Sequence, residues 1–424
     1  MERETAVANT KADPPTLATI GELPMVVKAI RDYAPQSDFA NLCLVSQQFY
    51  HVGNVMLYES ITLLSKGNRD TRSILALKRT LTARPWLAFY VRRLRCLSHH
   101  RGRISADDLE DSSLLGILSD LLSLLERLED LEIVDCFPQS SEGAERLNQS
   151  LRWVPSLRRF TCNLRVPQWP QPAPKLYAVN TSILKGALSL PSLLTFSTTL
   201  EEDPLAEALS LPANSSISTL SLNNLFVSTE TFRTILAALP QITDLNLEFV
   251  RFIDSYDSHV SRHVDCRELQ TAISGFTLKL RRLRVVADFR SVEGGDPCQG
   301  GGDDAPWGVL STLNLKAFPM LTELELSPEL LLGWKVESSP ELSACLPCHL
   351  ESLYLRYDYG AWYDSVWDFE RLSEKLRPYI DHQSSLRSLT VEYFDFLEDE
   401  ITTLSSSLRT ECEHAGICFR LRLI

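Results

Sequence analysis

Cysteine and histidine residues near the C-terminus are the residues whose spacing could carry chemistry. Residues 345–349, CLPCH, have the gap between cysteines that occurs in thiol redox pairs and in haem attachment. Together with Cys412, His414 and Cys418 they could supply ligands to zinc, but the combined spacing is not that of a known zinc finger. We therefore predict no metal site, no haem and no other cofactor, and metal analysis of the purified protein should find no stoichiometric zinc.

A glycine-rich segment at residues 292–306 is the other candidate for ligand chemistry. Phosphate-binding loops end in Gly-Lys followed by Ser or Thr, and this segment lacks that ending. From residue 293 onward it also lacks large apolar side chains, so we expect a flexible insertion. The chain has no Gly-x-Ser-x-Gly elbow, and its eight histidines form no motif with a nucleophile or a carboxylate. No active site is indicated, and we expect that the protein is not an enzyme.

The overall composition is that of an ordinary folded chain. It has 424 residues, of which 44% are hydrophobic and 23% charged, enough for a large core or an extended repeat array. The net charge of -13 argues against a general nucleic-acid binder, because phosphate binding needs clustered positive charge. The one basic run, residues 92–103, is expected to be a solvated edge. The longest leucine-rich stretch, residues 114–125, contains Asp120 and is too short to span a membrane.

The N-terminus and the cysteines indicate the compartment. Residues 1–20 lack the positive and apolar regions of a secretory signal, so we expect a disordered tail. Several of the ten cysteines, such as Cys96, Cys136 and Cys162, stand where repeating aliphatic residues are expected. We therefore predict reduced, buried thiols in a protein of the cytoplasm, the nucleus or both.

The elements that position these residues come from a repeat in the body of the chain. Its unit is an apolar triplet of the form L-x-x-L-x-L, with other apolar residues or threonine allowed. The last two positions of each triplet have strand spacing, and the segments between triplets have helical spacing, as at residues 228–239 and 396–412. The ten copies are Val91/Leu94/Cys96, Leu128/Leu131/Ile133, Leu157/Phe160/Cys162, Leu193/Phe196/Thr198, Ile217/Leu220/Leu222, Ile242/Leu245/Leu247, Leu280/Leu283/Val285, Leu321/Leu324/Leu326, Leu350/Leu353/Leu355 and Leu386/Leu389/Val391.

These triplets resemble those of leucine-rich-repeat proteins. The resemblance implies an α/β solenoid over residues 65–424, with parallel strands on the concave face and helices outside. The unit lengths are irregular, and the asparagine that the family uses after the triplet is largely missing, so we expect a degenerate, uneven arc. A set of unrelated α/β units is the alternative.

Residues 23–58 contain a second pattern, of helical spacing. Apolar residues from Leu23 to Ile30 predict a first helix, and Ala34-Pro35 ends it. Ser37 or Asp38 can cap a second helix that continues through Met56. Residues 42–45, LCLV, make that helix apolar on more than one side, and a unit of about 40 residues is too small to bury both sides. The surplus must therefore contact the rest of the chain or another protein.

Residues 21–64 resemble an F-box, the three-helix module that docks a Skp-type linker subunit, in a chain of the fungal F-box-like type. The resemblance lies in the Leu-Pro start, the Leu-Val-Ser run, a phenylalanine and the closing LYESITL, and it departs at Met25 and Tyr33. A mere helical cap of a larger domain is the alternative. The residues that the resemblance assigns to docking or to the core beneath it are Leu23, Pro24, Val27, Ile30, Leu42, Leu44, Val45 and Phe49.

The two resemblances together imply a substrate-recognition adaptor of an SCF-type E3 ubiquitin ligase. The module would hold the linker and through it the cullin and RING subunits, while the repeats present an unidentified protein target. The alternative is a non-catalytic scaffold whose F-box is vestigial or independent of the ligase. A cryptic enzyme would need a convergent polar pocket that no motif indicates.

The residue between the last two members of each triplet should project onto the concave face. Eight such positions have mixed chemistry, which suits a protein partner, and they are Glu132, Thr161, Ser221, Asn246, Arg284, Glu325, Tyr354 and Thr390. Aromatic residues gather at 354–369, and aromatics are frequent in binding hot spots. We predict that Tyr354, Tyr357 and Trp362 contact the target beside Arg284 and Glu325. The alternative is that half of the aromatics pack between repeats.

Overall fold

The structure is a computed structural model, and it describes most of the chain. The described residues are 25, 27–28, 30–31, 33, 36–65, 72–98, 113–136, 141–164, 175–200, 211, 215–223, 226–227, 229–248, 251–252, 264–286, 309–333, 335–357, 367–393 and 398–423. Leu23, Pro24 and Trp362, the predicted tail at 1–20 and the predicted insertion at 292–306 lie outside these residues.

A twelve-stranded sheet runs through the molecule, and every neighbouring pair of its strands is parallel. Its strands, in spatial and chain order, are β1 (Ser60–Ser65), β2 (Arg93–Ser98), β3 (Asp130–Cys136), β4 (Arg159–Leu164), β5 (Thr195–Thr199), β6 (Thr219–Asn223), β8 (Asp244–Glu248), β11 (Arg282–Val286), β13 (Glu323–Leu326), β14 (Ser352–Leu355), β15 (Ser388–Tyr393) and β16 (Cys418–Leu423). Two short pairs lie beside it, β7 (Phe226–Val227) with β9 (Arg251–Phe252), and β10 (Val264–Asp265) with β12 (Val309–Leu310).

The ten predicted triplets coincide with the ten strands from β2 to β15, which confirms the strand prediction. β1 and β16 were not predicted as members of the sheet, because each lacks an ordinary first triplet residue. That position is Tyr58 for β1, still inside a helix, and Gly416 for β16. Gly416 has φ +74°, a conformation that glycine adopts without steric cost. The predicted domain boundary at residue 64 falls inside β1.

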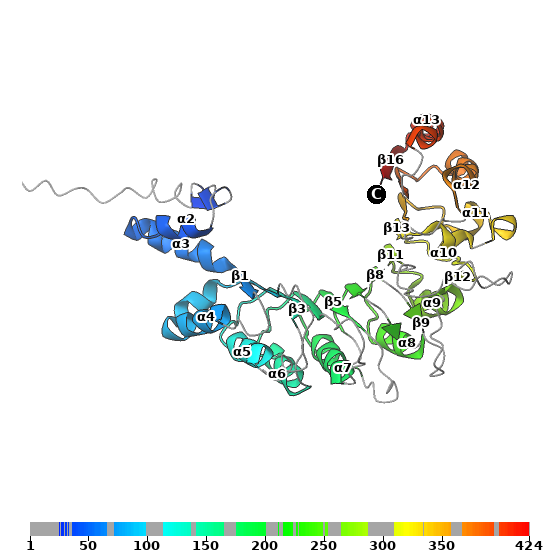
Figure 1. Ribbon diagram of the computed structural model, residues 1–424. Coiled ribbons are helices and arrows are strands. Elements are labelled where there is room, and N and C mark those ends of the chain that lie inside the picture. The colour runs from blue at the N-terminus through cyan, green and yellow to red at the C-terminus, as the bar shows by residue number, and fades with distance from the viewer. Residues whose placement is uncertain are drawn as a thin grey trace, which may run out of the picture.

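Helices follow the strands and cover one face of the sheet. Figure 1 shows the sheet as an arc with strands on its inner side and helices on its outer side. Buried apolar residues at helical spacing, such as Phe232, Ile235 and Leu236, anchor the helices to the sheet. The helices are α4 (Arg72–Ala83), α5 (Ser113–Leu122), α6 (Ser141–Leu151), α7 (Lys175–Leu188), α8 (Thr229–Ala237), α9 (Cys266–Ile273), α10 (Pro328–Leu332), α11 (Leu342–Cys345), α12 (Phe369–His382) and α13 (Glu398–His414), with 3-10 turns η1 (Pro85–Tyr90), η4 (Ser274–Phe276) and η6 (Val336–Ser338).

Hydrogen bonds before each strand keep the units in register. The carbonyl of Arg158, for example, accepts bonds from the N–H groups of Leu194 (2.9 Å) and Thr195 (3.0 Å) of the next unit. The same forked arrangement recurs from Arg92 in the second unit to Glu351 near the C-terminus. Because it depends only on the turn into each strand, the unequal unit lengths are accommodated outside the sheet.

The N-terminal residues form a separate small core. Residues 25, 27–28, 30–31 and 33 are helical, followed by α2 (Gln36–Leu42) and α3 (Gln47–Glu59). Val27, Phe39 and Cys43 are buried together.

The prediction of one helix that Ser37 or Asp38 caps and that continues through Met56 was wrong. Both residues lie inside α2. The chain leaves the helical path after Leu42, and Ser46 caps α3 by accepting a hydrogen bond from the N–H of Phe49 (3.2 Å).

Candidate protein-interaction surfaces

An exposed apolar turn separates α2 from α3. Leu44 and Val45 keep 78% and 72% of their surface exposed, although both are large and aliphatic. The turn is held by hydrogen bonds from Leu44 N–H to the Asn41 carbonyl (3.0 Å) and from Val45 N–H to the Leu42 carbonyl (3.1 Å). Cys43, which directly precedes Leu44, is buried in the small core. The turn therefore presents two adjacent apolar side chains on a backbone that its own hydrogen bonds hold in place.

The predicted docking residues divide into two groups. Val27 is fully buried, and Ile30, Leu42 and Phe49 pack around the same core. Leu44 and Val45 lie outside the core. The sequence could not separate these roles, since both groups follow the same helical spacing. Beyond them, Met25 and Tyr33, where the F-box pattern is interrupted, are 71% and 92% exposed.

The N-terminal module is joined to the arc by α3 itself. Its last residue, Glu59, is followed directly by β1, and Glu59 forms an ion pair with Arg31 (2.9 Å). Tyr58 packs against the core of the arc, and Arg84 donates to the Tyr50 hydroxyl (3.5 Å). These contacts hold the module against the first units of the arc.

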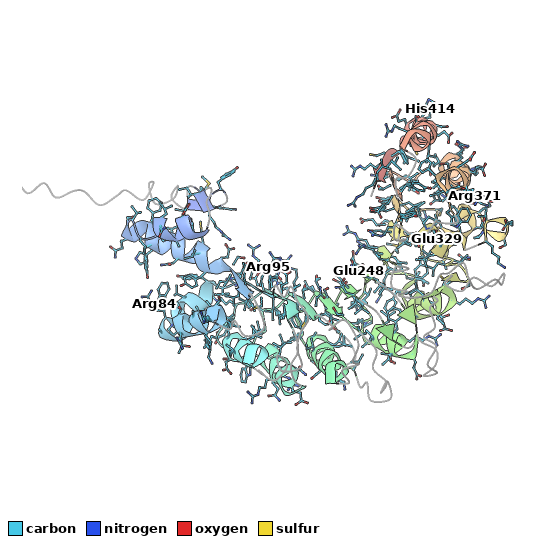
Figure 2. All side chains as sticks on the ribbon, viewed as in Figure 1. Arg84, Arg95, Glu248, Glu329, Arg371 and His414 are labelled. Atoms are coloured by element: carbon cyan, nitrogen blue, oxygen red, sulfur yellow. The ribbon has the colours of Figure 1, made fainter. Side chains whose placement is uncertain are left out.

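The eight predicted inner-face residues do share one face of the sheet. Strand register places them in a single row across neighbouring strands, together with Ser197 of β5 and Arg420 of β16. In Figure 2, Arg95 and Glu248 lie on the inner side of the arc, whereas Arg371 and His414 belong to the outer helices.

A chain of ion pairs crosses the C-terminal half of this face. Arg284 donates to the Asn246 side chain (3.1 Å), to Glu325 (2.8 Å) and to Glu248. Arg356 reaches Glu325 from the other side (2.7 Å). Burial by itself lowers the pKa of Arg284, but the hydrogen bonds that Arg284 donates to Glu325 and Glu248, together with the charges of these carboxylates, outweigh it and raise that pKa. The charges on this face therefore largely neutralise one another.

Glu392 extends the chain of ion pairs to the last strand. It is buried, and it accepts hydrogen bonds from the Tyr354 hydroxyl (3.0 Å) and the Tyr357 N–H (3.4 Å). Arg422 donates to the Tyr354 hydroxyl (3.1 Å). Burial raises the pKa of Tyr354, Arg422 opposes the rise, and Glu392 adds to it.

Sequence reasoning missed Glu248, Arg356, Glu392 and Arg422. Each stands one position beyond the last member of its triplet or strand pattern, and so also faces inward. The position directly after each triplet could therefore have predicted further inner-face residues from the sequence.

The predicted target-binding residues are only partly available to a partner. Arg284 and Glu325 pair with each other, and the Tyr357 ring packs on Tyr393, with ring centres 5.7 Å apart. Trp367 and Phe369, which belong to the aromatic concentration at residues 354–369, are core residues with 1% and 3% exposure. The packing alternative therefore holds for these two aromatics.

A hollow of about 320 Å³ lies on the inner face between β6 and β14. Its polar lining includes Asn246, Arg282, Arg284, Glu325 and Tyr354. Such a lining can form hydrogen bonds and ion pairs with a protein surface.

Metal chemistry receives no support from the described part of the chain. No three His, Cys, Asp or Glu side chains come together there as a metal site, although the six candidates at 345–349 and 412–418 are all described. Cys345 and Cys412 are buried, while Cys348 and Cys418 are exposed. Within the same residues, no helix is both long enough and apolar enough to cross a bilayer.

A scan against models of known protein families finds no match for this sequence, and a search of curated proteins finds no significant relative.

Proposed function

We propose that the chain is a substrate-recognition adaptor of an SCF-type cullin-RING ubiquitin ligase. The observation that carries the proposal is the exposed Leu44–Val45 turn, which lies inside the F-box-like sequence and on the outside of its small core. Two adjacent exposed aliphatic side chains on a structured turn are typical of a protein-binding surface.

The remainder of the chain supports the same proposal. Its strand and helix layout resembles a leucine-rich-repeat solenoid, and the mixed polar chemistry of the inner face suits a protein target. In this role the chain is not an enzyme, because it brings a target lysine close to the transfer chemistry and supplies no nucleophile. The direct connection of α3 to β1 would fix the direction in which a target is presented.

Docking on this turn has a measurable energetic consequence. Burying a large aliphatic side chain stabilises a complex by about 1.5 to 3 kcal/mol, and Leu44 and Val45 are each about three quarters exposed. Together they should contribute about 2 to 4 kcal/mol, or about 30-fold to 1,000-fold in affinity. Aspartate at both positions would place charge in an apolar contact and abolish docking.

The experiment is a binding measurement between the full chain and a purified Skp-type linker subunit. The test variant is Leu44→Asp/Val45→Asp, and the matched control is Leu278→Asp/Met320→Asp, which changes exposed apolar residues on the arc. We expect binding by the wild type and the control, and none by the test variant, with equal thermal unfolding of all three. Absence of wild-type binding would refute the proposal in favour of a scaffold with a vestigial module.

A further inference from the structure

The last strand of the sheet, β16, has one edge to which no described strand is hydrogen-bonded. Within the described residues it pairs only with β15, and the Cys418 N–H donates to the Arg387 carbonyl (2.8 Å) on that side. In a parallel strand, alternate residues direct their N–H and C=O groups to opposite sides. The backbone groups of Phe419, Leu421 and Leu423 therefore point away from β15, ready to pair with another strand.

The side chains of β16 alternate in chemistry as well. Arg420 and Arg422 lie on the inner face, in register with Thr390 and Glu392 of β15. Phe419 and Leu421 face the helix layer and are half-buried against the core of the arc. Leu423, on the same side, is 44% exposed. An added strand could therefore cover apolar surface on one face and meet arginines on the other.

The two arginines differ in their pairing. Arg422 lies 3.7 Å from Glu392 and also donates to Tyr354. Arg420 is exposed and forms no ion pair or hydrogen bond through its side chain with the described residues. It is thus a positive charge beside the free edge that an incoming carboxylate could neutralise.

The opposite edge of the sheet lacks this combination. On β1 the inner-face positions are Ser60, Thr62 and Leu64, which carry no charge. The helices α3 and α4 pack against β1, as α13 packs against β16. Among the described residues, the edge strand β16 itself carries arginines on the inner face, whereas the edge strand β1 carries no charge there.

We infer that the β16 edge binds an extended acidic segment of a partner protein, which adds to the sheet as a further strand. Its acidic residues would face Arg420 and Arg422, and the alternating apolar residues would extend the layer of Phe419 and Leu421. A second copy of this chain is the less favourable occupant. Two β16 edges related by a two-fold axis pair antiparallel and bring arginine against arginine. The inference does not depend on the docking function proposed above.

The test uses the full chain and two labelled synthetic peptides of nine residues. Valine alternates with glutamate in one peptide and with lysine in the other. We expect the glutamate peptide to bind in a salt-dependent way and to slow hydrogen exchange of the amides in residues 417–423. The lysine peptide should not bind.

Three variants locate the site. Arg420→Glu should lower the affinity for the glutamate peptide at least about tenfold and allow the lysine peptide to bind. Arg409→Glu makes the same charge change on the exposed side of α13 and should leave both affinities within about twofold. Leu421→Pro removes an N–H that faces the free edge, spares those directed at β15, and should abolish peptide binding.

Two results would overturn the inference. One is the absence of binding by the glutamate peptide, or binding that Arg420→Glu and Arg409→Glu weaken equally. The other is self-association of the wild type in sedimentation, if the Leu421→Pro variant does not self-associate. That result would assign the edge to a second copy of the chain.

Discussion

The contact between Gly53 and Cys43 gives a sharp test of how the Leu44–Val45 turn is built. Gly53 lies inside α3, and a Cβ placed on it would overlap the Cys43 Sγ, which is buried in the small core. The Gly53→Ala change should therefore push the turn away from α3. Since Cys43 directly precedes Leu44, the apolar turn would move with it.

The magnitude follows from two opposing effects. Alanine in a helix interior is more favourable than glycine by about 1 kcal/mol. Overpacking a buried contact costs about 1 to 3 kcal/mol, so the net loss in Gly53→Ala should be about 0 to 2 kcal/mol. In a chain that also carries Cys43→Ala, the sulfur is absent, and Gly53→Ala should then stabilise the module instead of destabilising it. The nearest remaining atom of residue 43 is then its Cβ at 3.4 Å, an ordinary contact, and the new methyl fills the space.

The assay is hydrogen exchange of the α3 amides, which reports the free energy of local opening. We expect faster exchange in Gly53→Ala and recovery in Cys43→Ala/Gly53→Ala, with a coupling energy of at least about 1 kcal/mol.

Gly116→Ala is the control, because the nearest atom to its new methyl is Arg146 Nη1 at 3.9 Å. It should leave α3 unchanged. If Gly53→Ala slowed exchange, or if Cys43→Ala failed to restore it, the packing described for the turn would be wrong.

Two further predictions concern ionisable groups. Burial raises the pKa of Cys345 and of Cys412 to about 11, so about one thiol in 1,000 is ionised at pH 8. In native protein treated with iodoacetamide and mapped by mass spectrometry, Cys348 and Cys418 should be alkylated before Cys345 and Cys412, and early labelling of Cys345 would contradict this. The raised pKa of Tyr354 means that the folded state holds its proton more tightly than the unfolded state. Its contribution to stability should be complete below pH 10 and decline above it, so denaturant midpoints should fall more steeply in wild type than in Tyr354→Phe.

Local rules predicted the repeating part of the fold. An apolar triplet needs only its own spacing to define a strand, and helical spacing between triplets defines the outer layer. Strands β1 and β16 were not predicted, because the first triplet position is Tyr58 in one and Gly416 in the other. The break before α3 was not predicted, because residues 42–45 fit helical spacing. The hydrogen bond by which Ser46 caps α3 becomes apparent only in the folded structure.

The ion pairs of the inner face could not be predicted in the same way. Arg284 and Glu325 are 41 residues apart, and their contact depends on the alignment of β11 with β13. The sequence placed both residues on the inner face but not beside each other. Which of the described arginines form ion pairs is therefore known only from the assembled sheet.

This pairing also limits what a partner can gain on the inner face. A ligand that binds over Arg284 must replace bonds to Glu248 and Glu325, so a new ion pair there adds little. Drawing Arg422 away from Glu392 would take one charged partner from this buried carboxylate, which is costly. Arg420 has no such bond to lose within the described chain. We therefore expect charge recognition at the C-terminal edge of the sheet, and discrimination by shape and hydrogen bonding at the centre of the face.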